Sequence, residues 1–319
     1  MMESVTLDEL DRGLVHALQI DGRAPFSRIA EVLGSSENTV ARRYRRLRAA
    51  GVLRVVGAVD NTPTGHPTWV LRMRCTPDAT RTISEALARR ADTHWVHVLS
   101  GGTEISCATS AATPEALVDK LPRANRILAV SGHWLLHGFV NPQGWGALSC
   151  LTPHQADRLR PEPPEPDTRA CAVDETDQAL LSALSIDGRA GYAALAAHTG
   201  WSESTVRRRI EQLRRTGILG FQVDVVPEAL GYHASARLWL SVRTSALTTV
   251  GQTLAGHPEV QFAAVTTGPT NMLVGVVCRD SRDLYRYLTD RIGPLDAVGH
   301  LETAPVVRTL KRTGTLLPS

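Results

Sequence analysis

The chain contains one unit twice, and this repeat limits the fold more than any other feature of the sequence. Residues 8–53 align without a gap to residues 174–219, and 23 of these 46 positions are identical. Fainter similarity continues beyond them, where SGGTEISC (100–107) corresponds to TGPTNMLV (267–274). Because self-similarity at a fixed spacing is the mark of a duplicated structural unit, we expect two copies of the same domain pair.

Each copy begins with the pattern of three short helices. Apolar residues at helical spacing predict the first helix over 7–20, and Asp21-Gly22 ends it. A second helix is predicted over 25–33 with Pro25 at its first position, followed by a turn at Gly34. A third helix starts at its N-cap Ser36 and ends at Gly51, and a short strand follows as a wing. This order predicts a winged helix-turn-helix domain in each copy.

The third helix has one apolar face and one basic face. Val40, Tyr44 and Leu47 share the apolar face. The segment 36–54 holds six arginines and one glutamate, and arginine can contact either phosphates or guanine edges. The alternative is a solvated arginine-rich face on a helix used only for packing. The residues predicted to contact DNA are Ser36, Asn38, Thr39, Arg42, Arg43, Arg46, Ser202, Ser204, Thr205, Arg208 and Arg209.

The two copies of this helix are not equivalent. The second copy carries Trp201 in its turn, where a small aliphatic residue is usual, and Glu211 and Gln212 where the first copy has arginines. We therefore predict that the first copy contributes more to DNA affinity.

The second part of each copy alternates strands and helices in the order βαββαβ. Predicted strands cover 69–75, 94–100, 104–110 and 133–140, with helices at 80–90 and 114–121; the second copy has strands at 234–242, 260–267, 271–278 and 297–307, with helices at 246–255 and 281–292. Such a pattern predicts a ferredoxin-like sheet with its helices on one face. The expected fold class is α+β.

Five segments follow from this pattern: a helix-turn-helix domain at 1–60, a ferredoxin-like domain at 61–150, a linker at 151–172, a second helix-turn-helix domain at 173–226 and a second ferredoxin-like domain at 227–319. The linker contains PEPPEP, which favours an extended polyproline II conformation. A proline-rich ligand for another domain is the alternative.

Composition excludes several classes of protein. The net charge of +3 does not by itself indicate that the protein binds nucleic acid. Since 33 of the 35 basic residues are arginine, the number of arginines is poor evidence as well, and the positions of the arginines are the evidence that counts. Five scattered cysteines without a CxxC pair predict neither a zinc ribbon nor a disulfide framework. His94, His97, His133 and His137 have no carboxylate or cysteine at ligand spacing, so we expect neither a metal nor a cofactor.

The sequence contains no apolar stretch long enough to span a bilayer and no signal-peptide layout at its start. We therefore expect a cytoplasmic protein with no membrane partner.

Several of these motifs together resemble a known family. Asp-Glu-Leu-Asp at 8–11, Asp-Gly-Arg-Ala at 21–24, the helix-turn-helix, Ala-Gly-Val at 50–52 and the βαββαβ sheet are similar to the leucine-responsive/asparagine regulator (Lrp/AsnC) family of bacterial transcription factors. The resemblance covers nearly the whole chain, twice. It implies double-stranded DNA as a partner, homo-oligomers formed through the ferredoxin-like domains, and a small effector, commonly an amino acid, near the turn between the central strands.

That turn departs from the family pattern, which usually reads Gly-Asp-aromatic-Asp. Here residues 101–104 read Gly-Gly-Thr-Glu and residues 268–271 read Gly-Pro-Thr-Asn, so only Glu104 keeps a carboxylate for an ammonium group. An effector other than an amino acid, or a sheet that serves assembly alone, are the alternatives. The resemblance implies that the effector-binding residues are Gly101, Thr103, Glu104, Gly268, Thr270 and Asn271.

The sequence thus predicts a sequence-specific transcriptional regulator that is not an enzyme, with two recognition helices in one chain. The rival is an enzyme similar to the sirohaem decarboxylases, which resemble the family in fold and in paired arrangement. Those enzymes are expected to carry a His- and Arg-bearing strand pair with an Asn-Leu-Trp-like stretch, which SGGTEISC and TGPTNMLV lack. A metabolite sensor that does not bind DNA is a third reading, and it leaves both basic helices unexplained.

Overall fold

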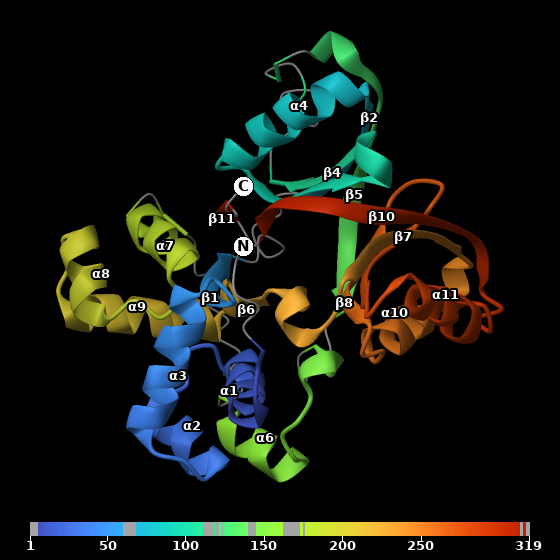
Figure 1. Ribbon diagram of the computed structural model, residues 1–319. Coiled ribbons are helices and arrows are strands. Elements are labelled where there is room, and N and C mark those ends of the chain that lie inside the picture. The colour runs from blue at the N-terminus through green and yellow to red at the C-terminus, as the bar shows by residue number, and fades with distance from the viewer. Residues whose placement is uncertain are drawn as a thin grey trace. The chain divides into compact units, whose positions relative to one another are not determined.

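The two copies of the repeat are interleaved in space. The computed structural model describes residues 6–59, 68–110, 118, 121–122, 124–139, 145–161, 173–174, 176–312 and 315–316. The chain divides into a helical unit, Met1–Gly65 with Leu148–Ala229, and a sheet unit, His66–Ala147 with Leu230–Ser319. Each unit therefore combines the corresponding parts of both copies (Figure 1). The predicted helix at 114–121 and the proline-rich segment fall almost wholly outside the described residues.

The helical unit contains the two predicted helix-turn-helix domains. The first comprises α1 (Glu9–Ile20), α2 (Phe26–Leu33), α3 (Glu37–Ala49) and β1 (Leu53–Val59), and the second α7 (Asp177–Ile186), α8 (Tyr192–Thr199), α9 (Glu203–Arg215) and β6 (Leu219–Val225). Gly34 and Gly200 make the turns with left-handed φ angles of 62° and 75°, which glycine adopts without strain. Pro25 is the N-cap of α2 and not its first helical residue.

The apolar face predicted for the third helix is confirmed. Val40, Tyr44 and Leu47 are buried in α3, as are Val206, Ile210 and Leu213 in α9. Ser36 caps α3 by accepting a hydrogen bond from the Thr39 N–H at 3.1 Å. Ser202 caps α9 in the same way, from the Thr205 N–H at 3.2 Å.

The strand after each third helix forms as expected, and its partner comes from the other copy. β1 pairs antiparallel with β6 along its whole length, from Leu53 opposite Val225 to Val59 opposite Leu219. Arg54 and Asp224, which face each other across this pair, also form an ion pair. The predicted wings therefore join the two helix-turn-helix domains.

The segment predicted as an extended linker, 151–172, begins with a helix. The helix α6 (Pro153–Leu159) starts with a capping box between Thr152 and Gln155 and has proline in its first turn, where no intrahelical N–H is needed. The Gln155 side chain donates to the Val32 carbonyl at 3.0 Å, and Leu159 is fully buried. The proline-rich composition of the segment hid this helix, which belongs to the first helix-turn-helix domain.

We expect Leu159→Ala to lower the free energy of unfolding by about 2–5 kcal/mol, because it removes a fully buried side chain and leaves a cavity. Urea unfolding followed by circular dichroism measures this loss. Arg160→Ala, at the exposed end of α6, is the control. A loss below about 1 kcal/mol for Leu159→Ala would mean that α6 is not part of the folded domain.

The sheet unit contains the two predicted ferredoxin-like halves. The strands are β2 (Thr68–Cys75), β3 (Thr93–Leu99), β4 (Glu104–Thr109), β5 (Ile127–Phe139), β7 (Ala234–Val242), β8 (Val260–Thr266), β9 (Met272–Cys278), β10 (Val298–Arg312) and β11 (Thr315–Leu316), with helices α4 (Pro77–Arg89), α10 (Leu247–Ala255) and α11 (Ser281–Tyr287). The predicted second helix of the second copy continues from α11 to Ile292 with wider, π-type turns.

These strands form one sheet that closes on itself. The order is β11-β10-β3-β4-β2-β5-β8-β9-β7, and β10 also pairs with β7, so both copies share one ring of strands. Since side chains alternate along a strand, each half has a helix-covered face and an inner face. Leu71 and Ile83 belong to the first helix-covered core, and Leu238 and Leu254 to the second. On the inner face, residues of both copies form a third cluster of Val70, Trp239 and Leu273.

Within the described residues, no helix has the length and apolar character needed to cross a membrane.

Candidate nucleic-acid interface

Arg42 and Arg208 occupy equivalent, exposed positions on the two third helices. Each lies opposite the buried stripe of its helix, at 100° per residue, and its side chain extends away from the domain core. Neither guanidinium has a hydrogen-bond or ion-pair partner among the residues that the structure describes. Asn38 and Ser204, one turn before them, are also exposed. These four exposed residues lie on the polar faces of the two third helices.

Arg43 lies on the flank of the buried stripe and not on the exposed polar face. Its guanidinium contacts Asp8 at 2.5 Å and Asp11 at 3.4 Å, and Arg46 reaches Asp11 at 2.5 Å. The Asp11 N–H, together with Arg43, lowers the pKa of Asp8 below its usual value, which favours the charged pair. Arg43 is predicted to contact DNA together with Arg42; the structure shows that its side chain is only partly exposed and connects α3 to the start of α1.

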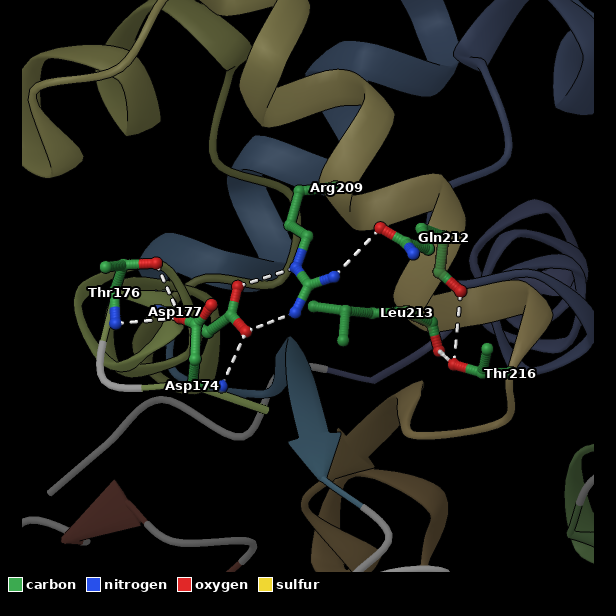
Figure 2. A network of polar contacts seen from close by, with 7 residues as sticks. All are labelled: Asp174, Thr176, Asp177, Arg209, Gln212, Leu213 and Thr216. Atoms are coloured by element: carbon green, nitrogen blue, oxygen red, sulfur yellow. Dashed lines mark hydrogen bonds and ion pairs between the residues drawn. The ribbon is translucent and has the colours of Figure 1, made fainter. Parts of the chain in front are cut away.

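The second copy repeats this anchor with more complete burial. Figure 2 shows the Arg209 guanidinium between Asp177 and Gln212: it donates to Asp177 at 2.7 and 2.5 Å and to the Gln212 side chain at 2.8 Å. The Asp177 side chain is 1% exposed and that of Arg209 18%. Asp177 also accepts the Asp174 N–H at 3.1 Å. The aspartate pair at the start of each first helix thus holds the third helix, and in α1 it also forms the capping box. Sequence reasoning missed this link to the third helix, although both copies keep it.

We expect Asp177→Ala to cost about 2–4 kcal/mol of stability, because it removes the partner of a largely buried guanidinium. The coupling to Arg209 is measured by a double-mutant cycle of Asp177→Ala and Arg209→Ala in urea unfolding. Additive losses in the double variant would contradict the anchor.

Ser36, Thr39, Ser202 and Thr205 belong to the caps of the third helices. The Ser36 and Thr39 hydroxyls are 2.9 Å apart, and so are those of Ser202 and Thr205. Helix N-termini carry free N–H groups and partial positive charge, which suit a phosphate. In the structure, these four predicted contact residues fix the conformation of the N-terminal turn of each third helix through their hydrogen bonds.

Two arginines of the repeated Asp-Gly-Arg-Ala motif lock the two domains together. Arg23 donates to the carbonyls of Gly188 and Ala190, at 2.7 and 3.1 Å. In return Arg189 donates to the carbonyls of Gly22 and Ala24, at 2.7 and 3.0 Å. We call these four hydrogen bonds the arginine clasp.

Aromatic rings pack against both arginines of the clasp, one in each direction. The Arg189 guanidinium lies 4.3 Å from the centre of the Phe26 ring, and Arg23 lies 5.1 Å from that of Tyr192. Burial lowers the pKa of both arginines, which nevertheless remain charged at neutral pH.

Reciprocal ion pairs join the third helices to the opposite domains. Arg48 at the end of α3 pairs with Asp187 at 2.8 Å, and its counterpart Arg214 pairs with Asp21 at 3.0 Å. Because the clasp hydrogen bonds and these ion pairs occur in both directions, Arg42 and Arg208 are held as a symmetric pair.

The predicted effector residues lie in the two turns of the sheet unit, and several use their polar groups within the protein. Glu104 binds Arg72 at 2.5 Å. The Asn271 side chain both accepts from and donates to the Val242 backbone at 2.8 Å, so it fastens a turn to β7. The Thr103 hydroxyl donates to the Ser100 carbonyl, while Gly101 and Gly268 supply positive φ angles.

Two cavities lie beside these turns. One of about 450 Å³ is lined by Thr270, Arg72, His133 and Glu302 among others. A second of about 360 Å³ is lined by Glu104 and again by Arg72 and Glu302. The structure thus brings Thr270 and Glu104 to neighbouring cavities. Among the described residues no group of three or more His, Cys, Asp or Glu side chains is placed to hold a metal ion.

Comparisons with known proteins agree with this architecture. The AsnC-type helix-turn-helix domain matches residues 7–48 and 173–214, and the Lrp/AsnC ligand binding domain matches residues 235–316. The HTH-type transcriptional regulator FL11 of Pyrococcus horikoshii is 34% identical over 145 residues, which cover 45% of this chain and 95% of FL11. The regulatory protein AsnC of Escherichia coli is 31% identical over 150 residues, 44% of this chain and 96% of AsnC.

Among solved structures, the siroheme decarboxylase NirDL matches with a TM-score of 0.64 over 96% of this chain and 93% of that chain. At 14% identity this likeness concerns the fold alone. The helix-turn-helix matches, the ligand-domain match and the near-complete coverage of FL11 and AsnC establish the relationship: the chain belongs to the Lrp/AsnC family, with two copies of its helix-turn-helix domain.

Proposed function

We propose that the protein is a sequence-specific DNA-binding transcriptional regulator in which one chain supplies both recognition helices. The observation that carries this proposal is the symmetric pairing of the two helix-turn-helix domains, with Arg42 and Arg208 exposed at equivalent positions. The relatives FL11 and AsnC, named as regulators, support it. Access to chromosomal DNA implies a cytoplasmic protein.

The geometry leads to a particular mode of binding. The N-terminal turns of α3 and α9 enter successive major grooves, where Asn38 and Ser204 meet base edges. Arg42 and Arg208 bind guanine bidentately or bind the adjacent phosphates. Since two-fold related helices read two half-sites of opposite orientation, the operator is an inverted repeat with half-site centres about 34 Å, one helical turn, apart.

The sheet unit supplies regulation and assembly in this proposal. The cavities beside Thr270 and Glu104 receive a small-molecule effector, and outer surfaces of the sheet unit join chains into homo-oligomers. Both ferredoxin-like halves already pair within one chain, as the partners of a family dimer would.

A mobility shift with DNA from upstream of the protein's own gene tests DNA binding. We expect a discrete complex that a hundredfold excess of scrambled DNA does not displace, with an affinity that falls steeply as salt rises. Equal competition by scrambled DNA would refute sequence specificity.

We propose a regulator and not an enzyme, because the likeness to NirDL concerns the fold whereas the sequence relatives are regulators. The purified protein is therefore expected to take up no tetrapyrrole. A stable visible absorption band after incubation with iron-uroporphyrin would overturn this part of the proposal.

A further inference from the structure

The outward faces of α3 and α9 carry different side chains, although the two helices are held alike. Opposite the buried stripe of each helix, exposed side chains recur every three or four residues along one line, which we call the outward row. The outward row of α3 is Asn38, Arg42, Arg45 and Ala49, and that of α9 is Ser204, Arg208, Glu211 and Arg215. Only the arginine at the second position is shared.

The residues that hold the two helices in place are, by contrast, the same in both copies. Arg43 and Arg209 bind the aspartates at the starts of α1 and α7. Arg48 and Arg214 form ion pairs with aspartates of the opposite domain. The two domains therefore present their outward rows in equivalent positions, and the rows differ in what they offer to DNA.

The first position of the row differs in chemistry and in freedom. The Asn38 carboxamide has no hydrogen-bond partner among the residues that the structure describes. The Ser204 hydroxyl lies 2.9 Å from that of Ser202, the N-cap of α9. A carboxamide pairs with the N6 and N7 atoms of adenine through two hydrogen bonds, which a serine cannot do. The first copy therefore selects adenine at a position where the second copy selects weakly.

The third position carries opposite charges. Arg45 donates through Nε to the Ala41 carbonyl of its own helix at 3.2 Å, so its terminal nitrogens point to solvent without an ion pair in the described part of the chain. Glu211 instead accepts from Arg207, four residues earlier, at 3.1 Å. An arginine binds guanine or phosphate, whereas a carboxylate repels phosphate and accepts from the N4 amino group of cytosine.

The fourth position moves the positive charge along the helix. Ala49 of α3 has no polar group, whereas Arg215 of α9 is exposed. The first row thus has its arginines at the second and third positions, and the second row at the second and fourth. Because phosphates lie at fixed intervals along the duplex, the two helices meet the DNA backbone at different points.

Exposed helix positions also vary when they have no role, so the differences by themselves indicate nothing. Two observations indicate that both rows remain in use. The arginine at the second position is kept in both copies, without a partner in the described part of the chain. The clasp and the reciprocal ion pairs hold both helices, including the second, in the arrangement of a pair.

We propose that the chain reads an asymmetric operator, in which the two inverted half-sites differ in sequence. The half-site under α3 has an adenine facing Asn38 and a guanine or phosphate facing Arg45. The half-site under α9 has no fixed base at the first of these points and a cytosine facing Glu211. This inference rests on the proposed function and deepens it, because it assigns the residues that distinguish the two half-sites.

Unlike half-sites give the regulator a direction. Two identical recognition helices, as in a homodimer, bind an inverted repeat equally well in either orientation. A chain with two different helices binds in one orientation, with its first copy always on the same half-site. The two copies of the chain therefore lie on defined sides of the operator relative to the gene that it controls.

Selection of duplexes from a random pool by the full chain, followed by fluorescence anisotropy, tests this inference. We expect the selected sequence to contain two unlike half-sites in opposite orientation. Two symmetric duplexes are then built, each carrying one of these half-sites twice. The asymmetric duplex should bind at least about tenfold more tightly than either symmetric duplex, because each symmetric duplex places mismatched bases under one helix.

Exchanging the outward residues should exchange the preference. Ser204→Asn with Glu211→Arg gives α9 the residues of α3 and should make one symmetric duplex the tightest ligand, by about tenfold. Asn38→Ser with Arg45→Glu should do the same for the other symmetric duplex. All four positions are exposed, so thermal unfolding should not change. The control is Glu85→Arg, which makes the same charge reversal in an Arg–Glu pair of equal spacing on α4, and it should keep the native preference.

Two results would overturn this inference. One is a selected sequence with two identical half-sites, and the other is a preference for the asymmetric duplex that both exchange variants retain. Either result leaves sequence-specific DNA binding intact. Failure of the proposed function looks different: no sequence is enriched from the pool, and the asymmetric operator is then refuted with it.

Discussion

Replacing Arg42 and Arg208 together by alanine is expected to weaken binding to the specific operator about 100-fold or more, while the protein remains as stable as before. Each side chain is exposed and unpaired among the described residues, so its removal disturbs no contact of the fold. A bidentate arginine–guanine contact provides about 1–3 kcal/mol of discrimination, and the double variant removes two of them.

Fluorescence anisotropy on the operator and on scrambled DNA, over a range of salt concentrations, measures this effect. The salt dependence of the remaining binding should correspond to about two fewer phosphate contacts if the arginines bind phosphate, and should be unchanged if they bind guanine.

The matched control is the pair Arg43→Ala and Arg209→Ala. These adjacent arginines hold Asp11 and Asp177, so their loss should reduce stability before it reduces the affinity of the folded protein. An unchanged operator affinity in the Arg42 and Arg208 double variant would show that DNA binds another surface.

Removing the arginine clasp should uncouple the two recognition helices. Arg23→Ala with Arg189→Ala deletes four hydrogen bonds from guanidinium groups to backbone carbonyls, each typically contributing about 1.5–3 kcal/mol, together with the contacts to the aromatic rings. We expect a loss of stability of at least about 4 kcal/mol, since part of the contribution returns when water solvates the freed groups.

The effect on DNA binding distinguishes positioning from simple destabilisation. In the native chain both half-sites are engaged by a preorganised pair of helices, so the second contact does not carry an additional ordering cost. In the clasp variant, affinity for the two-half-site operator should fall about 10- to 100-fold and become tolerant of changed half-site spacing. Affinity for an isolated half-site should not change.

Operators with one to five added base pairs between the half-sites measure that tolerance at a temperature where circular dichroism shows both proteins folded. Arg81→Ala, which removes an arginine with an 80% exposed side chain from the sheet unit, is the control. If the clasp variant rejects altered spacing as strictly as the native chain does, the clasp does not set the distance between the recognition helices.

The local features of the fold could be predicted from the sequence because they depend only on the types and the spacing of residues that are close together in the chain. The caps Ser36 and Ser202, the glycine turns and the buried stripe of the third helix follow from residue type and spacing. The alternation of strands and helices likewise identified the ferredoxin-like halves.

The pairing of the copies could not be deduced in this way. Nothing in the spacing of β1 shows that its partner is β6, 166 residues later, or that β10 closes the ring against β7. The roles of Arg23 and Arg43 depend on contacts between distant parts of the chain, which residue type and spacing do not reveal. Arg23 donates to backbone carbonyls of the other copy, and Arg43 binds the aspartate pair at the start of α1. α6 was missed because the proline-rich composition dominated the reading of its segment.

The central claim is that one chain reads both half-sites. It is tested most directly by titrating a labelled duplex, which carries the inverted repeat recovered by genome-wide footprinting, at a concentration well above Kd. We predict saturation at one chain per duplex, with both half-sites protected from hydroxyl-radical cleavage. Saturation at two chains per duplex, or protection of a single half-site at one chain per duplex, would contradict the account.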